Sequence, residues 1–351
     1  MVTELVPTPV DPSTAGRDYW ERHHEFRRVR QKEVRPDDPP RPDDVEEETL
    51  KRDDPFQIVN RFEISRDGTM LSSLGGQTVR PGTPEYATNK HLYSADVYVR
   101  PDQRRHGIGS MWVPVLLGLM ERHGCSVLSM WSEQDAGHAF MRWLGAEGRF
   151  NGAENRLDLK QVDWAMVKRW VEEGARRSPD TRLETYDGPL PESMWGDYAP
   201  QLMAMLNTIP FEDLDHGEIV ITPDHMREFY HRMAATREIE YTILTREPDG
   251  TISGITDCRW APYRATIVYQ GFTGVRPEAR GRGIGKWIKA AMLLHLRELH
   301  PEARWMATDN AGSNAPMLAI NQRLGFRQYR AGTEYQVTRD RLEEKVKTLE
   351  R

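Results

Sequence analysis

The sequence contains one eleven-residue pattern twice, about half a chain length apart, and this repeat constrains the fold more than any other feature. The first copy occupies residues 99–109 (VRPDQRRHGIG) and the second occupies residues 275–285 (VRPEARGRGIG). Both copies keep the opening Val-Arg-Pro, the central Arg and the closing Gly-Ile-Gly. A repeat at this spacing indicates a duplicated domain, because solenoids repeat about every 20 to 50 residues.

The residues around the two copies repeat as well. A β-rich apolar stretch precedes each copy, at 91–99 and 266–275, and an apolar stripe with helical spacing follows each one. A short strand and a second helix come next, and this helix ends in Leu-Gly at 144–145 and at 324–325. The repeated surroundings support a duplicated domain rather than a solenoid of short units.

We expect a first domain at residues 1–160, a linker helix at 161–180 and a second domain at 181–351. A length of 351 residues agrees with two domains of ordinary size. Asp163 is a suitable N-cap for the linker helix, which should run to about Arg177. The apolar residues of this helix fall on one stripe, so one face of it should pack against a domain.

Composition and charge exclude several classes of protein. The chain has 54 acidic and 48 basic residues and a net charge of -6, so it lacks the basic footprint of a nucleic-acid-binding protein. Cys125 and Cys258 lie far apart and have no neighbour at metal-ligand spacing, which argues against a disulfide framework and a zinc site. No stretch is long and apolar enough to span a membrane, and no signal peptide is evident. We therefore expect a cytoplasmic protein without a metal, a membrane or a nucleic-acid partner.

The repeated turn has the properties of a phosphate-binding site. The start of a helix presents backbone N–H groups without an intrahelical partner, and the helix dipole favours an anion there. Glycines, which have no Cβ atom, let a phosphate approach the backbone closely. Arg276, Arg280 and Arg282 add positive charge around the second copy. The pattern therefore predicts a pyrophosphate cradle in each copy.

Two other interpretations of the turn compete with this one. A dinucleotide-binding fold has a third glycine, but Lys286 and Ile288 stand where it would fall, and the strand does not open the domain. A glycine-rich turn with solvated arginines is the other interpretation. It explains two copies in the same strand–helix context less well than it explains one.

The order of the motifs resembles the acetyl-CoA-binding core of the GNAT superfamily. The resemblance lies in a strand, the pattern Val-x-Pro-x-x-Arg-x-x-Gly-x-Gly, a helix, a strand, an Asn-rich turn, and a helix that ends in Leu-Gly-Phe. It covers residues 266–329 closely and 91–145 more loosely. The tandem arrangement is similar to that of actinobacterial two-domain members. It implies two tandem GNAT domains of the α/β (α+β) class, each with a mixed, mostly antiparallel central sheet flanked by helices.

The resemblance implies an acetyl-CoA site in the second domain. The family binds the CoA pyrophosphate at the loop before the cofactor helix, which here consists of Arg280, Gly281, Arg282, Gly283, Ile284, Gly285 and Lys286. The fourth strand of the family pairs with the pantetheine arm and supplies an N–H for the developing oxyanion. In this chain that strand ends in Phe272, Thr273, Gly274 and Val275. The Asn-rich turn places further cofactor contacts at Asn310 and Asn314.

One catalytic position departs from the family pattern. The family frequently has a tyrosine that protonates the leaving thiolate, but this chain has Asn321 there, and an amide is not a general acid. Tyr329 and Tyr335 are the candidates that could replace it, and the alternative is that both are ordinary core or surface tyrosines. Water is the other source of the proton.

The first copy departs further from the family pattern. Its cradle would consist of Val99, Arg104, Arg105, His106, Gly107, Ile108, Gly109 and Ser110. Gln134 and Met141 replace the pantetheine contact and the acid. Pro114 lies inside the expected cofactor helix, where a proline costs about 3 kcal/mol or forces a kink. We therefore expect the first domain either to bind CoA without turnover or to act as a scaffold.

The sequence defines the acceptor side less sharply. In the family, the segment before the central strands builds the acceptor pocket, and here it contains Glu212, Asp213 and Asp215, which could attract a cationic amine. A solvated acidic loop is the alternative. On the strands that lead to the cradle, Asp257 is a candidate general base and Tyr269 a candidate pocket residue. The alternative for Asp257 is a polar residue at a strand edge.

These observations predict an acetyl-CoA-dependent N-acetyltransferase that acts on the primary amine of a small molecule by direct attack in a ternary complex. The second domain is expected to carry the chemistry, in a monomer or a homodimer. A non-catalytic acyl-CoA sensor is the alternative from another class, and the missing tyrosine favours it. A protein amine acetyltransferase is the second alternative. Turnover distinguishes an enzyme from a sensor.

Overall fold

The computed structural model describes residues 5–350, which fold into two compact units. Unit 1 comprises the chain up to Asn151, the segment Glu212–Glu218 and the residues from Gly332 on, whereas unit 2 comprises Gly152–Phe211 and Ile219–Ala331. Each unit therefore takes residues from both halves of the sequence. The expected boundaries at residues 160 and 181 do not coincide with the limits of the units.

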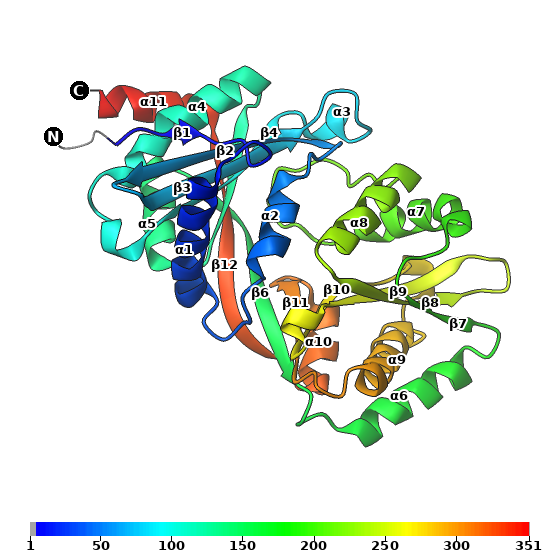
Figure 1. Ribbon diagram of the computed structural model, residues 1–351. Helices are drawn as coiled ribbons and strands as arrows, with labels where there is room; N and C mark the ends of the chain where they lie inside the picture. Colours follow the sequence, from blue (N-terminus) through cyan, green and yellow to red (C-terminus); the bar gives the residue numbers. More distant parts are fainter. Residues whose placement is uncertain (1–4, 351) are drawn as a thin grey trace. The chain divides into compact units, whose positions relative to one another are not determined.

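Unit 1 contains a mixed sheet with strand order β1-β2-β3-β4-β5-β12 (Figure 1). Neighbouring strands are antiparallel except β4 and β5, which are parallel. The strands are β1 (Thr8–Pro9), β2 (Gln57–Arg66), β3 (Thr69–Val79), β4 (Leu92–Val99), β5 (Val127–Ser132) and β12 (Arg327–Thr338). The helices are α1 (Arg17–Val34), α2 (Asp43–Lys51), α3 (Tyr86–Asn89), α4 (Trp112–His123), α5 (Asp135–Leu144) and α11 (Arg339–Leu349), with the short 3-10 helices η1 (Pro101–Gln103) and η2 (Ile108–Met111).

The strands of unit 2 follow in the order β6-β11-β10-β9-β8-β7 of the same twelve-stranded sheet. Only β10 and β11 are parallel here, so the sheet is mixed and mostly antiparallel in both units, as the sequence predicts. The strands are β6 (Glu147–Asp158), β7 (Arg182–Asp187), β8 (Ile239–Arg246), β9 (Ile252–Trp260), β10 (Ile267–Val275) and β11 (Trp305–Ala311). The helices are α6 (Trp164–Arg177), α7 (Glu192–Leu206), α8 (Pro223–Ala235), α9 (Ile284–Leu299) and α10 (Ala315–Leu324), with the 3-10 helices η3 (Pro262–Arg264) and η4 (Pro277–Ala279).

Two strands belong to a unit that is built mainly from the other half of the sequence. Strand β6 follows the first copy of the motif, but its residues 152–158 pair antiparallel with β11 in unit 2. Strand β12 follows the second copy, but its residues 333–338 pair antiparallel with β5 in unit 1. Each unit therefore depends on a strand from the other half of the chain.

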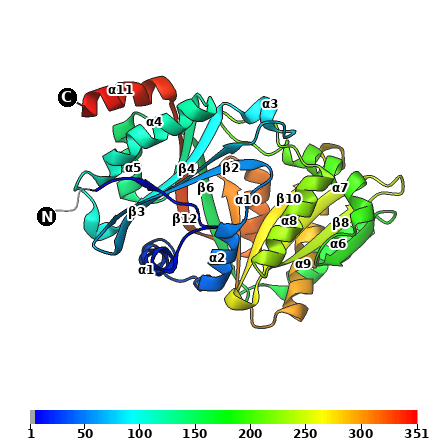
Figure 2. The ribbon, with the colours of Figure 1, turned by 45° about the horizontal axis from the view of Figure 1, so that its top comes forward.

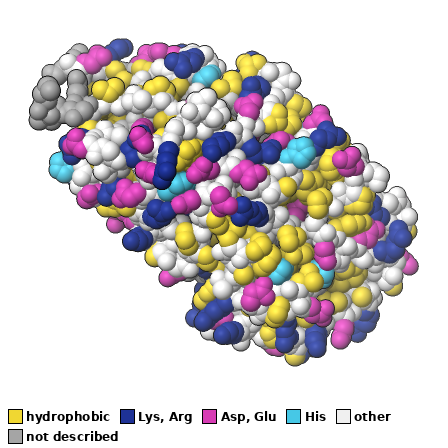
Figure 3. Space-filling view, in the orientation of Figure 1, with side chains coloured by type: hydrophobic (Ala, Val, Ile, Leu, Met, Phe, Trp, Pro, Cys, Tyr) yellow, Lys and Arg dark blue, Asp and Glu magenta, His cyan; other side chains and the backbone are white. Residues whose placement is uncertain are grey.

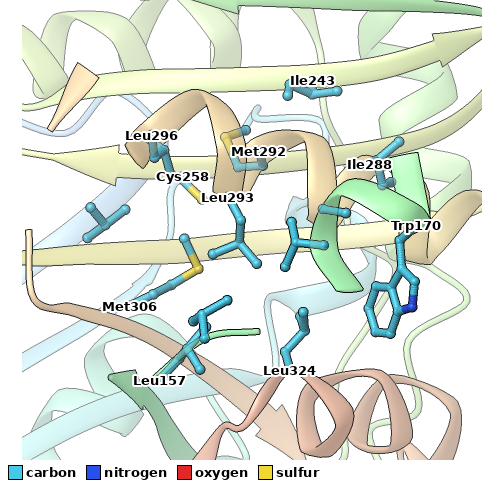
Figure 4. Close-up of a cluster of buried hydrophobic side chains, with 14 of the residues drawn as sticks. Leu157, Trp170, Ile243, Cys258, Ile288, Met292, Leu293, Leu296, Met306 and Leu324 are labelled. Atoms are coloured by element: carbon cyan, nitrogen blue, oxygen red, sulfur yellow. The ribbon is translucent and has the colours of Figure 1, made fainter. Parts of the chain in front are cut away.

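The expected linker helix belongs to the core of unit 2. Helix α6 begins after Asp163, whose carboxylate caps it by accepting the N–H of Met166 at 2.9 Å. Gly174 of α6 lies directly against the side chain of Trp287 in α9, so a larger residue at position 174 would collide with the indole. Figure 4 shows Trp170 of α6 in the same apolar cluster as residues of α9, β9 and β11. The helix is thus a structural layer of unit 2 rather than a free connection.

The two faces of the unit 2 sheet are covered by different helices. Helices α6 and α9 lie on one face of β8, β9 and β10, and helices α7 and α8 lie on the opposite face (Figure 1, Figure 2). Side chains alternate along β9, so Cys258 packs toward α9 whereas Ile255 packs toward α7 and α8. Asp257 and Arg259 share the face of Ile255, and this face carries the candidate acceptor site.

The surface and the cysteines agree with the composition. The face in Figure 3 carries acidic and basic side chains in alternation rather than one large basic patch. Cys125 and Cys258 are both buried and both free. Among residues 5–350, no helix combines the length and the apolar character that crossing a membrane requires.

Candidate functional site

Strands β10 and β11 of unit 2 pair over only part of their length. Parallel pairing joins residues 267–270 to 305–308 and then ends, although β10 continues to Val275 and β11 to Ala311. At the same point β10 has a bulge between Gln270 and Thr273 in its pairing with β9. Among the described strands, none pairs with the β11 side of β10 beyond this bulge. An extended ligand could therefore add hydrogen bonds to residues 272–275.

The turn after β10 has the expected form of a phosphate cradle. Gly281 and Gly283 have φ angles of +81° and +86°, in the left-handed region that favours glycine. Gly283 is the N-cap of α9 and no side chain caps this helix. The N–H groups of Ile284 and Gly285 therefore remain available to an anion, whereas the N–H of Lys286 donates to the carbonyl oxygen of Gly283 at 3.1 Å.

The arginines of this cradle are more constrained than their charge alone suggests. Arg282 Nη1 donates to Glu247 Oε1 at 2.9 Å, and the ion pair neutralises it. Arg276 donates to the side-chain oxygen of Gln201 at 2.9 Å. Arg280 is exposed and donates to the carbonyl oxygen of Val275 and to the hydroxyl group of Thr208, both at 3.2 Å, so its charge is not neutralised by these partners. Backbone N–H groups and one arginine thus provide most of the attraction for an anion.

The first copy, in unit 1, has the same turn but a different helix start. Gly107 has a φ of +82°, and the 3-10 helix η2 separates it from α4, which begins at Trp112. Arg104 is held by Glu33 through two hydrogen bonds of 2.7 Å. Arg105 and His106 are exposed, Ile108 is buried, and Val99, Gly109 and Ser110 are partly buried. Strands β4 and β5 also pair only over residues 92–94 and 127–129, so unit 1 has a comparable open strand edge.

Pro114 does not have the effect that the sequence suggests. It is the third residue of α4, in the first turn of that helix. The backbone N–H groups of a first turn have no partner within the helix, so proline removes no hydrogen bond from its interior. The expectation of a kink or of a large cost was wrong, because the helix begins later than the repeat implies.

Three asparagine side chains meet beyond the point where β10 and β11 stop pairing. Asn321 Nδ2 donates to Asn310 Oδ1 at 2.8 Å, and Asn155 Nδ2 of β6 lies 3.4 Å from the same oxygen. Asn321 is only 2% exposed, and its Oδ1 has no hydrogen-bond partner among the described residues. Asn314 instead caps α10 by accepting the N–H of Met317. Asn155 was missed because β6 belongs to the other half of the sequence.

Asp257 lies at the bulge of β10. Its carboxylate oxygens accept the N–H of Phe272 at 3.2 and 3.3 Å, and a Cβ atom on Gly271 would collide with it. Burial raises the pKa of Asp257 to about 6, although the charge of Arg259 lowers it in part. A carboxylate with such a pKa is a stronger base than an ordinary aspartate.

A second buried carboxyl group, which sequence reasoning missed, lies on the same face. Glu240 of β8 is 9% exposed, and burial and the charge of Asp257 raise its pKa to about 8. It is hydrogen-bonded to the hydroxyl group of Tyr230 in α8. Tyr198 of α7 is also buried, and the charges of both acids contribute to its raised pKa. The signal was an acidic residue near the start of an otherwise apolar strand, between Ile239 and residues 241–244.

The three candidate tyrosines are not equivalent. Tyr269 is on β10 with the guanidinium of Arg264 4.6 Å from its ring centre. Tyr329 lies under the guanidinium of Arg156, which is 3.6 Å from its ring centre. Tyr335 is in unit 1, where its hydroxyl group is 3.0 Å from Nδ1 of His138.

The predicted acidic acceptor patch belongs to unit 1. Glu212 Oε2 accepts the N–H of Asn151 at 3.1 Å, and Asp215 Oδ1 lies 2.9 Å from Nε2 of His91. Asp213 donates its backbone N–H to a carbonyl oxygen of unit 1. The structure thus places the patch in a different unit from Asp257, and two of its three carboxylates have fixed partners there. Among the described residues, no cluster of His, Cys, Asp and Glu is arranged to hold a metal ion.

Comparisons with known proteins identify the fold. Residues 20–146, within unit 1, match the model of the acetyltransferase (GNAT) family. A tandem GNAT protein from the clavulanic acid biosynthesis pathway aligns at 21% identity with a TM-score of 0.73, covering 96% of this chain and 99% of that one. A GCN5-related N-acetyltransferase from Sphaerobacter thermophilus aligns at 14% identity with a TM-score of 0.63, covering 95% and 96%.

A third solved structure extends the comparison to a larger protein. It is a GCN5-related glucosamine N-acetyltransferase region in a fungal multi-domain GH3 β-N-acetylglucosaminidase, at 14% identity and a TM-score of 0.63. The alignment covers 95% of this chain but 38% of that chain. A search of curated proteins finds no match. The structural matches therefore establish the fold, and the family match covers the copy whose motif departs further from the pattern.

Proposed function

From the match of residues 20–146 to the acetyltransferase (GNAT) family model and from the tandem GNAT fold of the chain, we propose that unit 2 is an acetyl-CoA-dependent N-acetyltransferase. It transfers an acetyl group to the primary amine of a small molecule by direct attack in a ternary complex. The observation that carries the proposal is Asp257, a carboxylate of raised pKa at the strand bulge. An open strand edge and an uncapped helix adjoin it in the same unit.

The chain offers acetyl-CoA a fitting donor side. The N–H groups of residues 281–285 would hold the pyrophosphate, because the glycines leave room and α9 has no side-chain cap. The free edge of residues 272–275 would hold the extended pantetheine arm by strand-like hydrogen bonds. Asn310 and Asn321 would border the arm from the β11 side, where the Asn321 carbonyl oxygen is buried and unpaired among the described residues. When bound, acetyl-CoA supplies the activated acetyl group.

Asp257 acts as the general base. An amine is protonated near neutral pH and becomes a nucleophile only after it loses a proton. Asp257 accepts this proton, directly or through a water molecule, and with a pKa of about 6 it is mostly ionised at neutral pH and able to do so. Phe272 fixes the carboxylate by its backbone N–H, so the base stays at the bulge. The new C–N bond then forms as the C–S bond of the thioester breaks.

The mechanism requires little help from a general acid. Asn321 cannot donate a proton, and Tyr329 is stacked under Arg156. A thiol has a pKa of about 8.5, so a thiolate leaves far more readily than an alkoxide or an amide ion would. We therefore assign Asn321 to holding the donor arm, and the thiolate takes its proton from water.

A small-molecule acceptor is favoured over a protein. One structural neighbour is described as a glucosamine N-acetyltransferase region, and another as a tandem GNAT protein from the clavulanic acid biosynthesis pathway. Glu240, which shares the face of Asp257, is buried in the same unit as α7 and α8 rather than displayed on an open surface that a polypeptide could cover. The acyl-CoA sensor would need the cradle but would have no use for a base of raised pKa.

Amine-dependent release of CoA from acetyl-CoA tests the proposal. A panel of small primary amines would be assayed with the wild-type chain and with Asp257→Asn, and CoA binding would be measured separately for both. The assignment would be supported if the wild type releases CoA in the presence of an amine and if Asp257→Asn, while still binding CoA, releases it far more slowly. CoA binding without release by any amine would favour the sensor, and full activity of Asp257→Asn would exclude Asp257 as the base.

A further inference from the structure

A row of polar side chains crosses strands β8, β9 and β10 on the face that α7 and α8 cover. Arg259 of β9 is in register with Glu240 of β8 on one side and with Tyr269 of β10 on the other. Residues directly opposite each other in antiparallel strands have their side chains on the same face. Asp257 precedes Arg259 by two residues and therefore shares this face. One cation and two carboxyl groups thus lie together beside the bulge.

Arg259 differs from Arg246 of β8 and from Arg264 of η3 because it has no fixed partner among the described residues. Arg246 is paired with Glu184 at 3.0 Å, and Arg264 is paired with Glu238 at 2.7 Å. Within residues 5–350, the guanidinium of Arg259 takes part in no hydrogen bond or ion pair, although the residue is partly buried. A guanidinium has five N–H donors in a planar fork that matches a carboxylate. The unused fork of Arg259 therefore points to a ligand that the chain itself does not supply.

Neither acid of the row takes this role. Glu240 is hydrogen-bonded to Tyr230, and burial raises its pKa, so it holds its proton near neutral pH. Asp257 is held at the bulge by the N–H of Phe272. Arg259 acts on both acids through its charge alone, lowering the pKa of each against the larger effect of burial.

We propose that the acceptor amine also carries a carboxylate, as an amino acid does, and that Arg259 binds this carboxylate while the amine lies at Asp257. The inference rests on the proposed function, since it assumes that unit 2 binds its acceptor on this face. A simple ammonium ion would be attracted by Asp257 and repelled by Arg259. A carboxylate on the same molecule turns the repulsion into a charge-assisted, bidentate contact.

Matched substrate pairs test the inference. Each amino acid of a panel would be compared with its own carboxamide, which keeps the amine and the side chain but removes the negative charge. Cadaverine would be compared with L-lysine in the same way. We expect the wild type to prefer the acid of its best pair by about 10- to 100-fold in kcat/KM, the range of a hydrogen-bonded charge pair. A preference for the carboxamide, or equal rates, would overturn the inference and leave the proposed acetyltransferase intact.

Three variants locate the preference at Arg259. Arg259→Met removes the charge and keeps the apolar stem. In this variant, the ratio of kcat/KM for the amino acid to kcat/KM for its carboxamide should be close to one. Arg259→Lys keeps a charge but loses the fork, so it should retain only part of the preference. Arg297→Met, an exposed position on α9, is the matched control and should keep the wild-type ratio. An unchanged ratio in Arg259→Met would refute the assignment of this residue.

A binding measurement separates the inference from turnover. Titration of the same amino acids into the CoA-loaded chain should give a dissociation constant at least about 10-fold tighter for the wild type than for Arg259→Met. Such binding without any acetyl transfer would support the carboxylate site and contradict the proposed function. Equal binding by both chains would count against the inference even if amines are acetylated. Thermal unfolding of each variant would establish that the loss is not one of folding.

Discussion

The ammonium group of Lys289 lies 2.5 Å from Oε1 of Gln270, inside the apolar core between α9 and the sheet of unit 2. Lys289 is only 2% exposed, and no carboxylate accompanies it in this hydrogen bond. Nε2 of Gln270 donates to the hydroxyl group of Thr256, which is 2.8 Å from the hydroxyl group of Thr273. Gln270 and Thr273 flank the bulge of β10. The buried cation is therefore linked to the strand on which the proposed donor site depends.

The first prediction concerns the stability cost of this cation. Burial lowers the pKa of Lys289 from 10.5 to about 7, so the folded chain disfavours the charged form that the unfolded chain keeps. The unfolded state then binds more protons between pH 7 and 10.5, and the stability contribution of Lys289 rises with pH across that window. Below pH 7, the lowered pKa corresponds to a loss of about 5 kcal/mol from the free energy of unfolding.

Replacing Lys289 by methionine removes that cost but leaves the amide of Gln270 without its donor. We expect Lys289→Met to be more stable than the wild type by about 2 kcal/mol at pH 7. The gain is smaller than the full cost of the buried charge because the loss of the buried hydrogen bond to Gln270 destabilises the variant by about 1–3 kcal/mol. The difference should shrink as the pH approaches 10. Urea unfolding at several pH values measures it. A difference that grows with pH would contradict a depressed pKa.

The second prediction is a pH profile. Because Asp257 must be ionised to accept a proton, kcat/KM of the wild type should rise with pH through about pH 6. The deprotonation of the amine itself adds a separate rise at higher pH. In Asp257→Asn, we expect a loss of about 10²- to 10⁴-fold and the disappearance of the lower limb only. Initial rates over pH 5 to 9 distinguish the two limbs, and a retained lower limb would assign it to another group.

The third prediction compares the two cradles. Gly283→Glu places a carboxylate in the turn of unit 2, and Gly107→Glu makes the matched change in unit 1, where φ is also positive. Both variants bear a similar backbone strain of about 1–2 kcal/mol, so a difference between them reports on the site. We expect Gly283→Glu to abolish both CoA binding, measured by calorimetry, and acetyltransferase activity. We expect Gly107→Glu to keep the activity. The reverse result would move the chemistry to unit 1, where the family match lies.

The fourth prediction follows from the two exchanged strands. A chain cut between β6 and α6 would leave residues 1–160 without β12 and residues 161–351 without β6. Each piece would then expose the unpaired edge of β5 or β11, and such edges promote aggregation. We expect neither piece to give a cooperative thermal transition alone, whereas co-expression should restore a one-to-one complex. Two stable, monomeric halves would show that the exchange is dispensable.

Much of the candidate donor site was predictable because it depends on local backbone conformation. Gly107 and Gly283 have positive φ angles at equivalent positions of the two copies, as a repeated glycine-rich turn requires. The cap of α6 at Asp163 was also predictable, since a capping carboxylate acts on a residue three positions away. Pro114 was misjudged, because the position at which a helix begins depends on the preceding 3-10 turn.

The acceptor side of the candidate site was not predictable, because it depends on contacts between residues that are far apart in the sequence. Asp257 was a candidate among several, and only the register of β8 with β9 brought it beside Glu240. Nothing in the sequence of residues 212–215 shows whether these acidic residues line an acceptor pocket or not. In the structure, their backbone and side chains are hydrogen-bonded within unit 1. Register is set over the whole sheet, so it cannot be read from one strand.

By itself, the sequence determined that this protein contains two copies of one strand–turn–helix unit, and that each copy ends its strand at a glycine turn able to receive an anion. These features follow from dihedral preference and hydrogen bonding within a few residues. Only the tertiary structure decided that β6 and β12 complete the opposite units, that Arg259 has no partner among the described residues, and that Lys289 is buried. These features arise from pairing and packing between residues far apart in the chain, where many sequences permit several partners and the complete fold selects one.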